Sequence, residues 1–238
     1  MARSIGNQSS ERLLIICRLW VGRVFWFAVP ILVVIFSLPR FLSALSTEAA
    51  FPVPTYIELN YPLPKSAYAA AFRLLLNANP RDGDASIAAA ECAQSAGTSS
   101  TLVASIAQQG LGRSPSSERG WTVLAEANEA TRDYRSASRY LSLAITLGHF
   151  DYRLAYRRSR DAATLWGELT VTEREQALEQ ARLLWEEPML RHYTIDLAQT
   201  REGAALLTRA LAGQPESVRS LNRNISQRRR SDRRWQKR

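Results

Sequence analysis

The sequence predicts an all-α protein, and three observations lead to that prediction. From Ser66 onward, apolar residues recur at the three- and four-residue intervals that place them on one face of a helix. Gly, Pro, Ser and Thr interrupt these stretches at intervals that leave room only for paired helices. No stretch alternates for long between apolar and polar residues, which is the pattern of a half-buried strand.

The first element is an apolar segment over 19–38, which follows the N-terminal residues 1–18. A helix of about 20 apolar residues is long enough to cross a bilayer. Arg23 lies near the start of the segment, where its side chain can reach the headgroups, and Trp20 and Trp26 suit a membrane interface. We therefore expect a transmembrane signal anchor here, with a buried core helix as an alternative.

The charges around this segment predict its orientation. Arg12, Arg18 and Arg23 lie on the N-terminal side, whereas Arg40 alone follows closely on the other side. Positive charge stays in the cytoplasm, so we expect a bacterial inner-membrane protein with a cytoplasmic N-terminus and a periplasmic C-terminal domain. A signal peptide cleaved near Ala44-Leu45-Ser46 remains a second interpretation.

The second element, over 39–65, contains five prolines and little apolar period, so it is expected to be an extended linker. The folded body would then occupy 66–217. Its helices are expected over 66–77, 84–95, 99–109, 118–130, 134–147, 151–169, 173–186, 189–198, 201–212 and 215–227. Thr172 and Glu175 match the pattern of a capping box that would open the helix over 173–186.

The stretch over 118–151 has a more specific spacing of small and bulky residues. Trp121, Leu124 and Ala125 lie on its first helix, Asp133 and Tyr134 lie at the turn, and the second helix carries Ala137, Tyr140, Leu141, Ala144 and Leu147. This pattern resembles a tetratricopeptide repeat (TPR), although Asn128 and His149 depart from it. Weaker matches in phase with it predict four hairpins, over 84–117, 118–151, 152–183 and 184–217. An unrelated helical bundle is the alternative.

The resemblance implies a solenoid whose concave face binds peptides or other proteins and is lined by the first helix of each hairpin. Carried over by position, the expected partner-binding groove consists of Arg119, Thr122, Glu126, Glu129, Arg153, Tyr156 and Arg160. It would place an acidic patch beside a basic one. A solvated helix face is the alternative interpretation of the same residues.

The last element, over 218–238, is expected to be a terminal helix with a basic tail. The net charge of the chain is +9, and most of it lies in the last eleven residues, with seven Arg or Lys residues against one Asp. The residues expected to contact an anionic surface are Arg228, Arg229, Arg230, Arg233, Arg234, Trp235, Lys237 and Arg238. A solvated, disordered terminus is the alternative, and nucleic-acid binding would need the tail in the cytoplasm.

Residues suited to catalysis or metal binding are few. The chain has two cysteines, Cys17 and Cys92, and two histidines, His149 and His192. The adjacent Glu186 and Glu187 diverge on a helix and cannot share a reacting atom. We expect no catalytic site, no cofactor, no metal and no small-molecule substrate, and hence no enzyme.

Together these features predict a membrane-anchored TPR-like scaffold that binds a protein partner. By resemblance, membrane-tethered repeat proteins of this kind accompany envelope machinery such as polysaccharide synthesis and export. The alternative function is a cytoplasm-facing membrane regulator whose Arg-rich tail binds nucleic acid or anionic lipid.

Overall fold

The computed structural model describes residues 31, 34–35, 37–38, 50, 52–58, 61–78, 82–149 and 151–235. The chain divides into two units, Met1–Glu48 and Ala49–Arg238. In the first unit, the five described residues are helical and exposed. The second unit is described below by itself.

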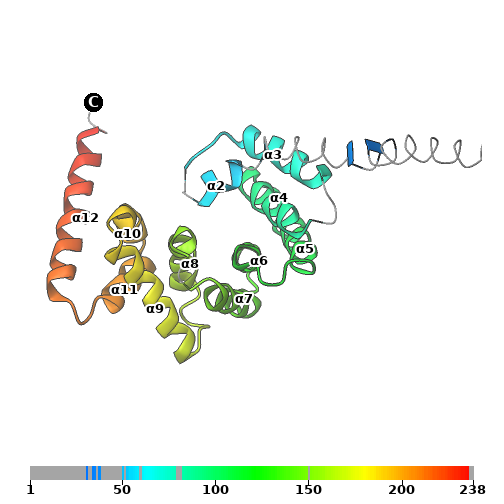
Figure 1. Ribbon diagram of the computed structural model, residues 1–238. Helices are drawn as coiled ribbons and strands as arrows, with labels where there is room; N and C mark the ends of the chain where they lie inside the picture. Colours follow the sequence, from blue (N-terminus) through cyan, green and yellow to red (C-terminus); the bar gives the residue numbers. More distant parts are fainter. Residues whose placement is uncertain are drawn as a thin grey trace, which may run out of the picture. The chain divides into compact units, whose positions relative to one another are not determined.

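The second unit consists of helices in the part of the chain that the structure describes, which confirms the predicted all-α class. Each helix from α3 to α9 packs against the next one in the chain, and α6 also packs against both α4 and α8 (Figure 1). The helices are α2 (Pro52–Glu58), α3 (Lys65–Ala78), α4 (Gly83–Ala96), α5 (Ser100–Leu111), α6 (Glu118–Ala130), α7 (Tyr134–Leu147), α8 (Tyr152–Thr164), α9 (Val171–Glu186), α10 (Arg191–Leu197), α11 (Arg201–Ala210) and α12 (Pro215–Trp235), with a 3-10 turn at Pro188–Leu190.

Acidic and hydroxyl side chains fix where these helices begin. Asp82, Ser117 and Asp151 cap α4, α6 and α8, and each side chain accepts a hydrogen bond from a backbone N–H of the first turn. Such caps contribute about 1 kcal/mol each. Helices α4, α6 and α8 begin at residues 83, 118 and 152, which are 35 and 34 residues apart. Equivalent positions therefore recur on these three helices.

The cap of α9 differs from the expected one. Thr170 accepts a hydrogen bond from the Glu173 N–H, and the Glu173 carboxylate accepts one from the Thr170 N–H. The capping box is therefore formed by Thr170 and Glu173, not by Thr172 and Glu175. Both pairs fit the capping-box pattern. Because Leu169 is buried immediately before Thr170, α9 begins at Val171, two residues before the expected start at residue 173.

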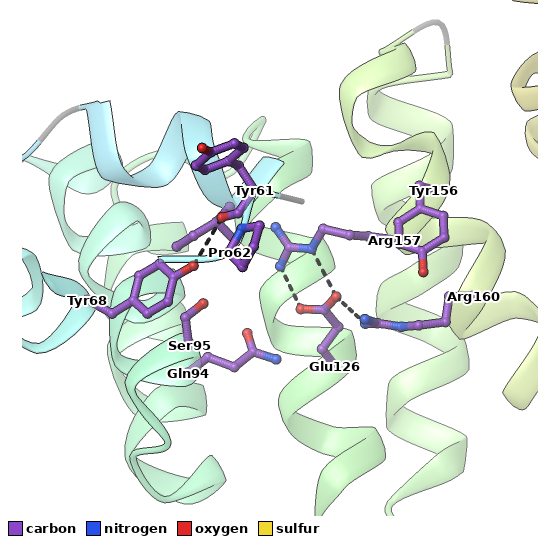
Figure 2. Close-up of a pocket in the computed structure, with 10 residues that line it drawn as sticks. Tyr61, Pro62, Tyr68, Gln94, Ser95, Glu126, Tyr156, Arg157 and Arg160 are labelled. Atoms are coloured by element: carbon purple, nitrogen blue, oxygen red, sulfur yellow. Dashed lines mark hydrogen bonds and ion pairs between the residues drawn. The ribbon is translucent and has the colours of Figure 1, made fainter. Parts of the chain in front are cut away.

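The proline-rich stretch over 39–65 contains a helix, where the sequence suggested an extended linker. Pro52 and Pro54 lie in the first turn of α2, where a missing N–H costs nothing because those groups have no partner within the helix. Helix α2 packs against α4 and α3. Tyr61 and Pro62, which follow α2, line one pocket together with Arg157 of α8 (Figure 2).

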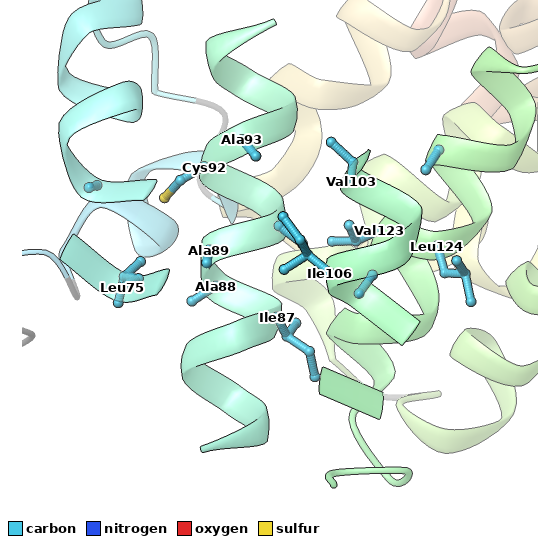
Figure 3. Close-up of a cluster of buried hydrophobic side chains, with 14 of the residues drawn as sticks. Leu75, Ile87, Ala88, Ala89, Cys92, Ala93, Val103, Ile106, Val123 and Leu124 are labelled. Atoms are coloured by element: carbon cyan, nitrogen blue, oxygen red, sulfur yellow. The ribbon is translucent and has the colours of Figure 1, made fainter. Parts of the chain in front are cut away.

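Three apolar clusters form the core. The first cluster joins Ala50 to α3, α4, α5 and α6 (Figure 3). Its small side chains let α4 lie close to α3 and α5. The second cluster joins α8 to the helices after it, and the third joins α6, α7, α8 and α9. The third cluster therefore connects the two larger ones.

The fold prediction needs one correction. Among the residues that the structure describes, no helix has both the length and the apolarity to cross a membrane. The predicted transmembrane helix over 19–38, and the inner-membrane location that depended on it, are therefore withdrawn. Most of 19–38 lies outside the described residues, as do the residues that gave its orientation and the suggested cleavage site.

The terminal helix is longer than expected, since α12 continues from Pro215 to Trp235 rather than ending near Gln227. Leu221 is buried, and Val218 and Ile225 pack against the second cluster. This apolar face attaches the first part of α12 to the body. The helix then continues into the arginine-rich sequence.

Candidate functional site

Charged side chains from four helices meet on one side of the second unit. The charged residues are Glu58 of α2, Glu91 of α4, Arg119 and Glu126 of α6, and Arg157 and Arg160 of α8, and we call them the inner network. We call the side of α4, α6 and α8 that carries the inner network the inner face. Three carboxylates therefore face three arginines.

One half of the inner network joins α2 to α4, α6 and α8. The Glu58 carboxylate is buried and pairs with the Arg119 guanidinium. Arg119 Nε also lies 3.2 Å from Glu91 Oε2, so one arginine connects two carboxylates. On the solvent side, Arg153 Nη1 lies 3.7 Å from Glu58 Oε2. Helix α2 is thus held by charge as well as by apolar contact.

Arg157 lies at the centre of the inner network. Its Nη1 donates to Glu91 Oε1 at 2.5 Å, and its Nε and Nη2 donate to the two oxygens of Glu126 at 3.0 and 2.6 Å. This is the bidentate geometry in which an arginine holds a carboxylate most firmly. Figure 2 shows the pair between α6 and α8. Arg157 therefore joins α4, α6 and α8 through side chains alone.

The other half of the inner network reaches solvent at Arg160. Its Nη2 donates to Glu126 Oε1 at 2.7 Å and to Asp161 Oδ1 at 2.9 Å. The Arg160 side chain is half exposed, whereas Asp161 is fully buried. Asp161 Oδ2 has no hydrogen-bond partner.

The carboxyl groups differ in their pKa values although all are buried. Burial raises the pKa of Glu91 more than Arg157 and Arg119 lower it. Burial also acts on Glu126, but Arg157 and Arg160 outweigh it and lower its pKa to about 2. Burial raises the pKa of Asp161 to about 7 against the effect of Arg160. Glu126 is therefore a fixed anion, and Asp161 changes charge near neutral pH.

Two cavities lie on either side of the inner network. The first, of about 230 Å³, is the pocket in Figure 2; α2 and the residues after it, α3, α4, α6 and α8 contribute its lining, which is Ile57, Tyr61, Pro62, Tyr68, Gln94, Ser95, Glu126, Tyr156, Arg157 and Arg160. The second, of about 470 Å³, is lined by Glu58, Asp84, Ile87, Ser114, Ser116, Ser117, Glu118, Arg119 and Arg153. Both cavities are open to solvent and mostly polar.

The residues predicted for the groove are placed in several ways. Arg119, Glu126 and Arg160 belong to the inner network, and they form ion pairs where separate acidic and basic patches were expected. Tyr156 lines the first cavity and its ring stacks on Tyr193 at 5.0 Å. Arg153 lines the second cavity and also pairs with Asp151 at 3.2 Å.

Two of the predicted groove residues contribute less to the inner face. Thr122 is fully buried, and its hydroxyl donates to the Glu118 carbonyl at 2.9 Å. Glu129 is partly buried, and burial raises its pKa despite the nearby Arg160.

Sequence reasoning missed Glu58, Glu91 and Arg157. Glu91 lies 35 residues before Glu126 at the equivalent position of the preceding helix. Arg157 lies four residues after Arg153 and three before Arg160, so the three share one helix face. These two signals were present in the sequence. Glu58 had no such signal, because the stretch around it was taken for a linker.

The basic tail is described in part. Arg228 is exposed on α12, and the backbone of α12 continues to Trp235, which includes Arg229, Arg230, Arg233 and Arg234. Lys237 and Arg238 lie outside the described residues.

Glu126 is poorly suited to transfer a proton, because two arginines hold its carboxylate and keep it ionised at ordinary pH. Within the described residues, no group of three or more His, Cys, Asp and Glu side chains is arranged to hold a metal ion. Cys92 is buried, and burial raises its pKa to about 12.

Two comparisons with known proteins give no further assignment. No protein-family model matches the chain, and a search of the curated proteins finds no similar sequence.

Proposed function

We propose that this chain is a TPR-like scaffold that binds a short segment of a protein partner on its inner face. One observation carries the proposal: a short segment of polypeptide, the chain's own α2 and the residues after it, already lies on that face. It is held there by ion pairs from Glu58 to α6 and α8 and by apolar contacts with α4. The envelope role depended on a membrane anchor and forms no part of the proposal.

The spacing of the helices and the composition of the inner face support this proposal. Helices α4, α6 and α8 begin at intervals close to the 34 residues of a tetratricopeptide repeat. Solenoids of such hairpins present an extended surface on one side. On the inner face, tyrosines and arginines gather beside two open cavities, and these residue types are enriched where proteins bind tightly.

The first experiment places a photoreactive amino acid at Tyr156 on the inner face. A matched position is Val171, which begins α9 and is 70% exposed. A partner should crosslink to the probe at position 156 and not to the probe at position 171. Equal capture by both probes would place the partner elsewhere on the molecule.

The captured partner is then purified and titrated against variants of the full chain. Arg153→Glu should weaken binding about tenfold or more, since one favourable charge becomes a repulsive one at the edge of the site. Arg139→Glu is the matched control, because Arg139 is an exposed arginine of α7. If both variants bind as the unmodified chain does, the inner face is not the binding site.

A further inference from the structure

We infer that the segment over 50–63, which the structure describes at 50, 52–58 and 61–63, is a tethered occupant of the partner site. We call it the inner segment, and we infer that the partner displaces it with an acidic side chain in place of Glu58. This inference rests on the proposed function and adds to it the chemistry of the partner. The ligand is a peptide that presents one carboxylate among apolar and aromatic residues.

The charges of the inner face show why a carboxylate is needed. With Glu58 in place, three glutamates face Arg119, Arg157 and Arg160 in the inner network. Without Glu58, Arg157 and Arg160 would keep their carboxylates, but Arg119 would keep only Glu91 at 3.2 Å. A mostly buried charge that loses one of its two partners is destabilised. A partner's carboxylate restores the balance, whereas a neutral or basic group does not.

The attachment of the inner segment is strong enough to fill the site and weak enough to be released. Ala50 and Pro54 are buried, and Val53 and Ile57 pack against the first apolar cluster. Beyond α2, the Leu63 N–H donates to the Tyr68 hydroxyl at 3.0 Å. Helix α2 has seven residues, and a helix of that length is not stable by itself in water.

The fit of the inner segment leaves room for a better ligand. Glu58 Oε2 is buried and accepts no hydrogen bond, and its ion pair with Arg153 Nη1 is long, at 3.7 Å. A cavity of about 470 Å³ borders the Glu58 ion pairs, and one of about 230 Å³ is lined by Ile57 and by residues after α2. A partner peptide with larger side chains on each side of its carboxylate can fill both cavities while it keeps the ion pair to Arg119.

The test uses the full-length chain and a fluorescent peptide with the sequence of the inner segment, AFPVPTYIELNYPL. Its affinity is measured by anisotropy for the unmodified chain and for the Glu58→Gln variant. The variant weakens the tethered occupant and leaves the arginines intact. We expect it to bind the peptide about tenfold or more tightly than the unmodified chain, because a competent site is more often open.

Two controls examine the role of charge in that measurement. A peptide with Gln in place of Glu58 should bind the Glu58→Gln variant about tenfold less tightly. The double variant Glu58→Gln, Arg153→Ala should also lose affinity for the acidic peptide. Circular dichroism of each variant shows whether its helix content is retained.

A second measurement needs no variant and decides the matter if Glu58→Gln fails to fold. The unmodified chain is mixed with excess peptide made from heavy isotopes, and hydrogen exchange is followed in the chain's own 52–58. Displacement should make these amides exchange faster, whereas amides of α11 should be unchanged. Unchanged exchange at 52–58 with the peptide at saturation would overturn the inference.

The outcomes separate this inference from the proposed function. Equal affinity of the peptide for the unmodified chain and for Glu58→Gln would mean that the inner segment does not block the site. If the peptide binds neither chain but a partner crosslinks specifically through position 156, the proposed partner site stands. The inference that its ligand is an acidic peptide is then wrong. A stable dimer that exchanges inner segments would also overturn the intramolecular occupation.

Discussion

Asp161 and Glu126 show how neighbouring carboxyl groups acquire opposite properties. Both are buried, but Glu126 accepts hydrogen bonds from two arginines, whereas Asp161 interacts with Arg160 through one oxygen and leaves the other without a partner. The pKa of Glu126 is consequently about 2 and that of Asp161 about 7. Burial raises both pKa values, but two arginines outweigh it at Glu126, whereas at Asp161 the single Arg160 is opposed by burial and by the charges of Glu126 and Glu129.

The raised pKa of Asp161 predicts a dependence of stability on pH. An unfolded Asp loses its proton near pH 4, so between about pH 4 and pH 7 the folded chain binds more protons than the unfolded one. Stability must therefore fall as pH rises through this window. The Asp161→Asn variant should not show this loss. From pH 5 to pH 8, its free energy of unfolding should therefore rise on the order of 1–4 kcal/mol relative to that of the unmodified chain.

Urea unfolding at the two pH values measures this gain, and Glu216→Gln is the control, because Glu216 is an exposed glutamate of α12. Its substitution should cost little at either pH. A gain for Asp161→Asn that does not change between the two pH values would mean that Asp161 is already ionised at pH 5.

Helices α4 and α5 approach each other closely where Gly83 and Gly110 meet. A Cβ atom added to Gly110 would lie 2.7 Å from Ile87 Cγ1 and 2.9 Å from the Gly83 carbonyl oxygen. A side chain at either glycine would push the pair apart. The crossing of α4 and α5 is therefore fixed by the absence of side chains at these two positions.

Gly110→Ala should destabilise the second unit by about 1–3 kcal/mol, because the added methyl group overlaps a backbone carbonyl that cannot move independently. Gly167→Ala is the control, since nothing lies within 4 Å of a Cβ at that turn. Thermal unfolding followed by circular dichroism compares them. Equal melting temperatures would contradict the close approach of the two helices.

The helices show what local sequence can and cannot predict. Helices expected over 118–130 and 134–147 match α6 and α7, because apolar period and capping residues act within a few positions. The start of α9 was misplaced by two residues, since two overlapping capping patterns exist and tertiary burial of Leu169 selects between them. Helix α2 was missed because its prolines are typical of a linker and the contacts that hold it come from helices far along the chain.

At the scale of the whole second unit, the inner network joins parts that have separate apolar cores. The first cluster lies around α4 and α5 and the second around α9 to α12. Arg157 links α8 to α4 and α6 across this division. Its partners lie 31 and 66 residues away in the sequence. The repeat spacing could point to these positions, but no local pattern could show that they pair with Arg157.

Removal of one member should show how much this link contributes. Glu126→Ala leaves Arg157 buried with Glu91 as its remaining carboxylate, and we expect a loss of about 3–5 kcal/mol in the free energy of unfolding. Glu179→Ala is the control, because Glu179 is half exposed and pairs with His149 at the surface; it should cost less than about 1 kcal/mol. Equal losses would mean that the inner network adds little to stability.

The buried thiol of Cys92 has a practical consequence. Cys92 is fully enclosed by α3 and its own helix, α4, and its pKa is raised to about 12, so the reactive thiolate is scarce while the helices are closed (Figure 3). In a Cys17→Ser background, a thiol reagent can modify the chain at this position only after α3 and α4 separate. The rate at which Cys92 is labelled therefore measures how often α3 and α4 separate.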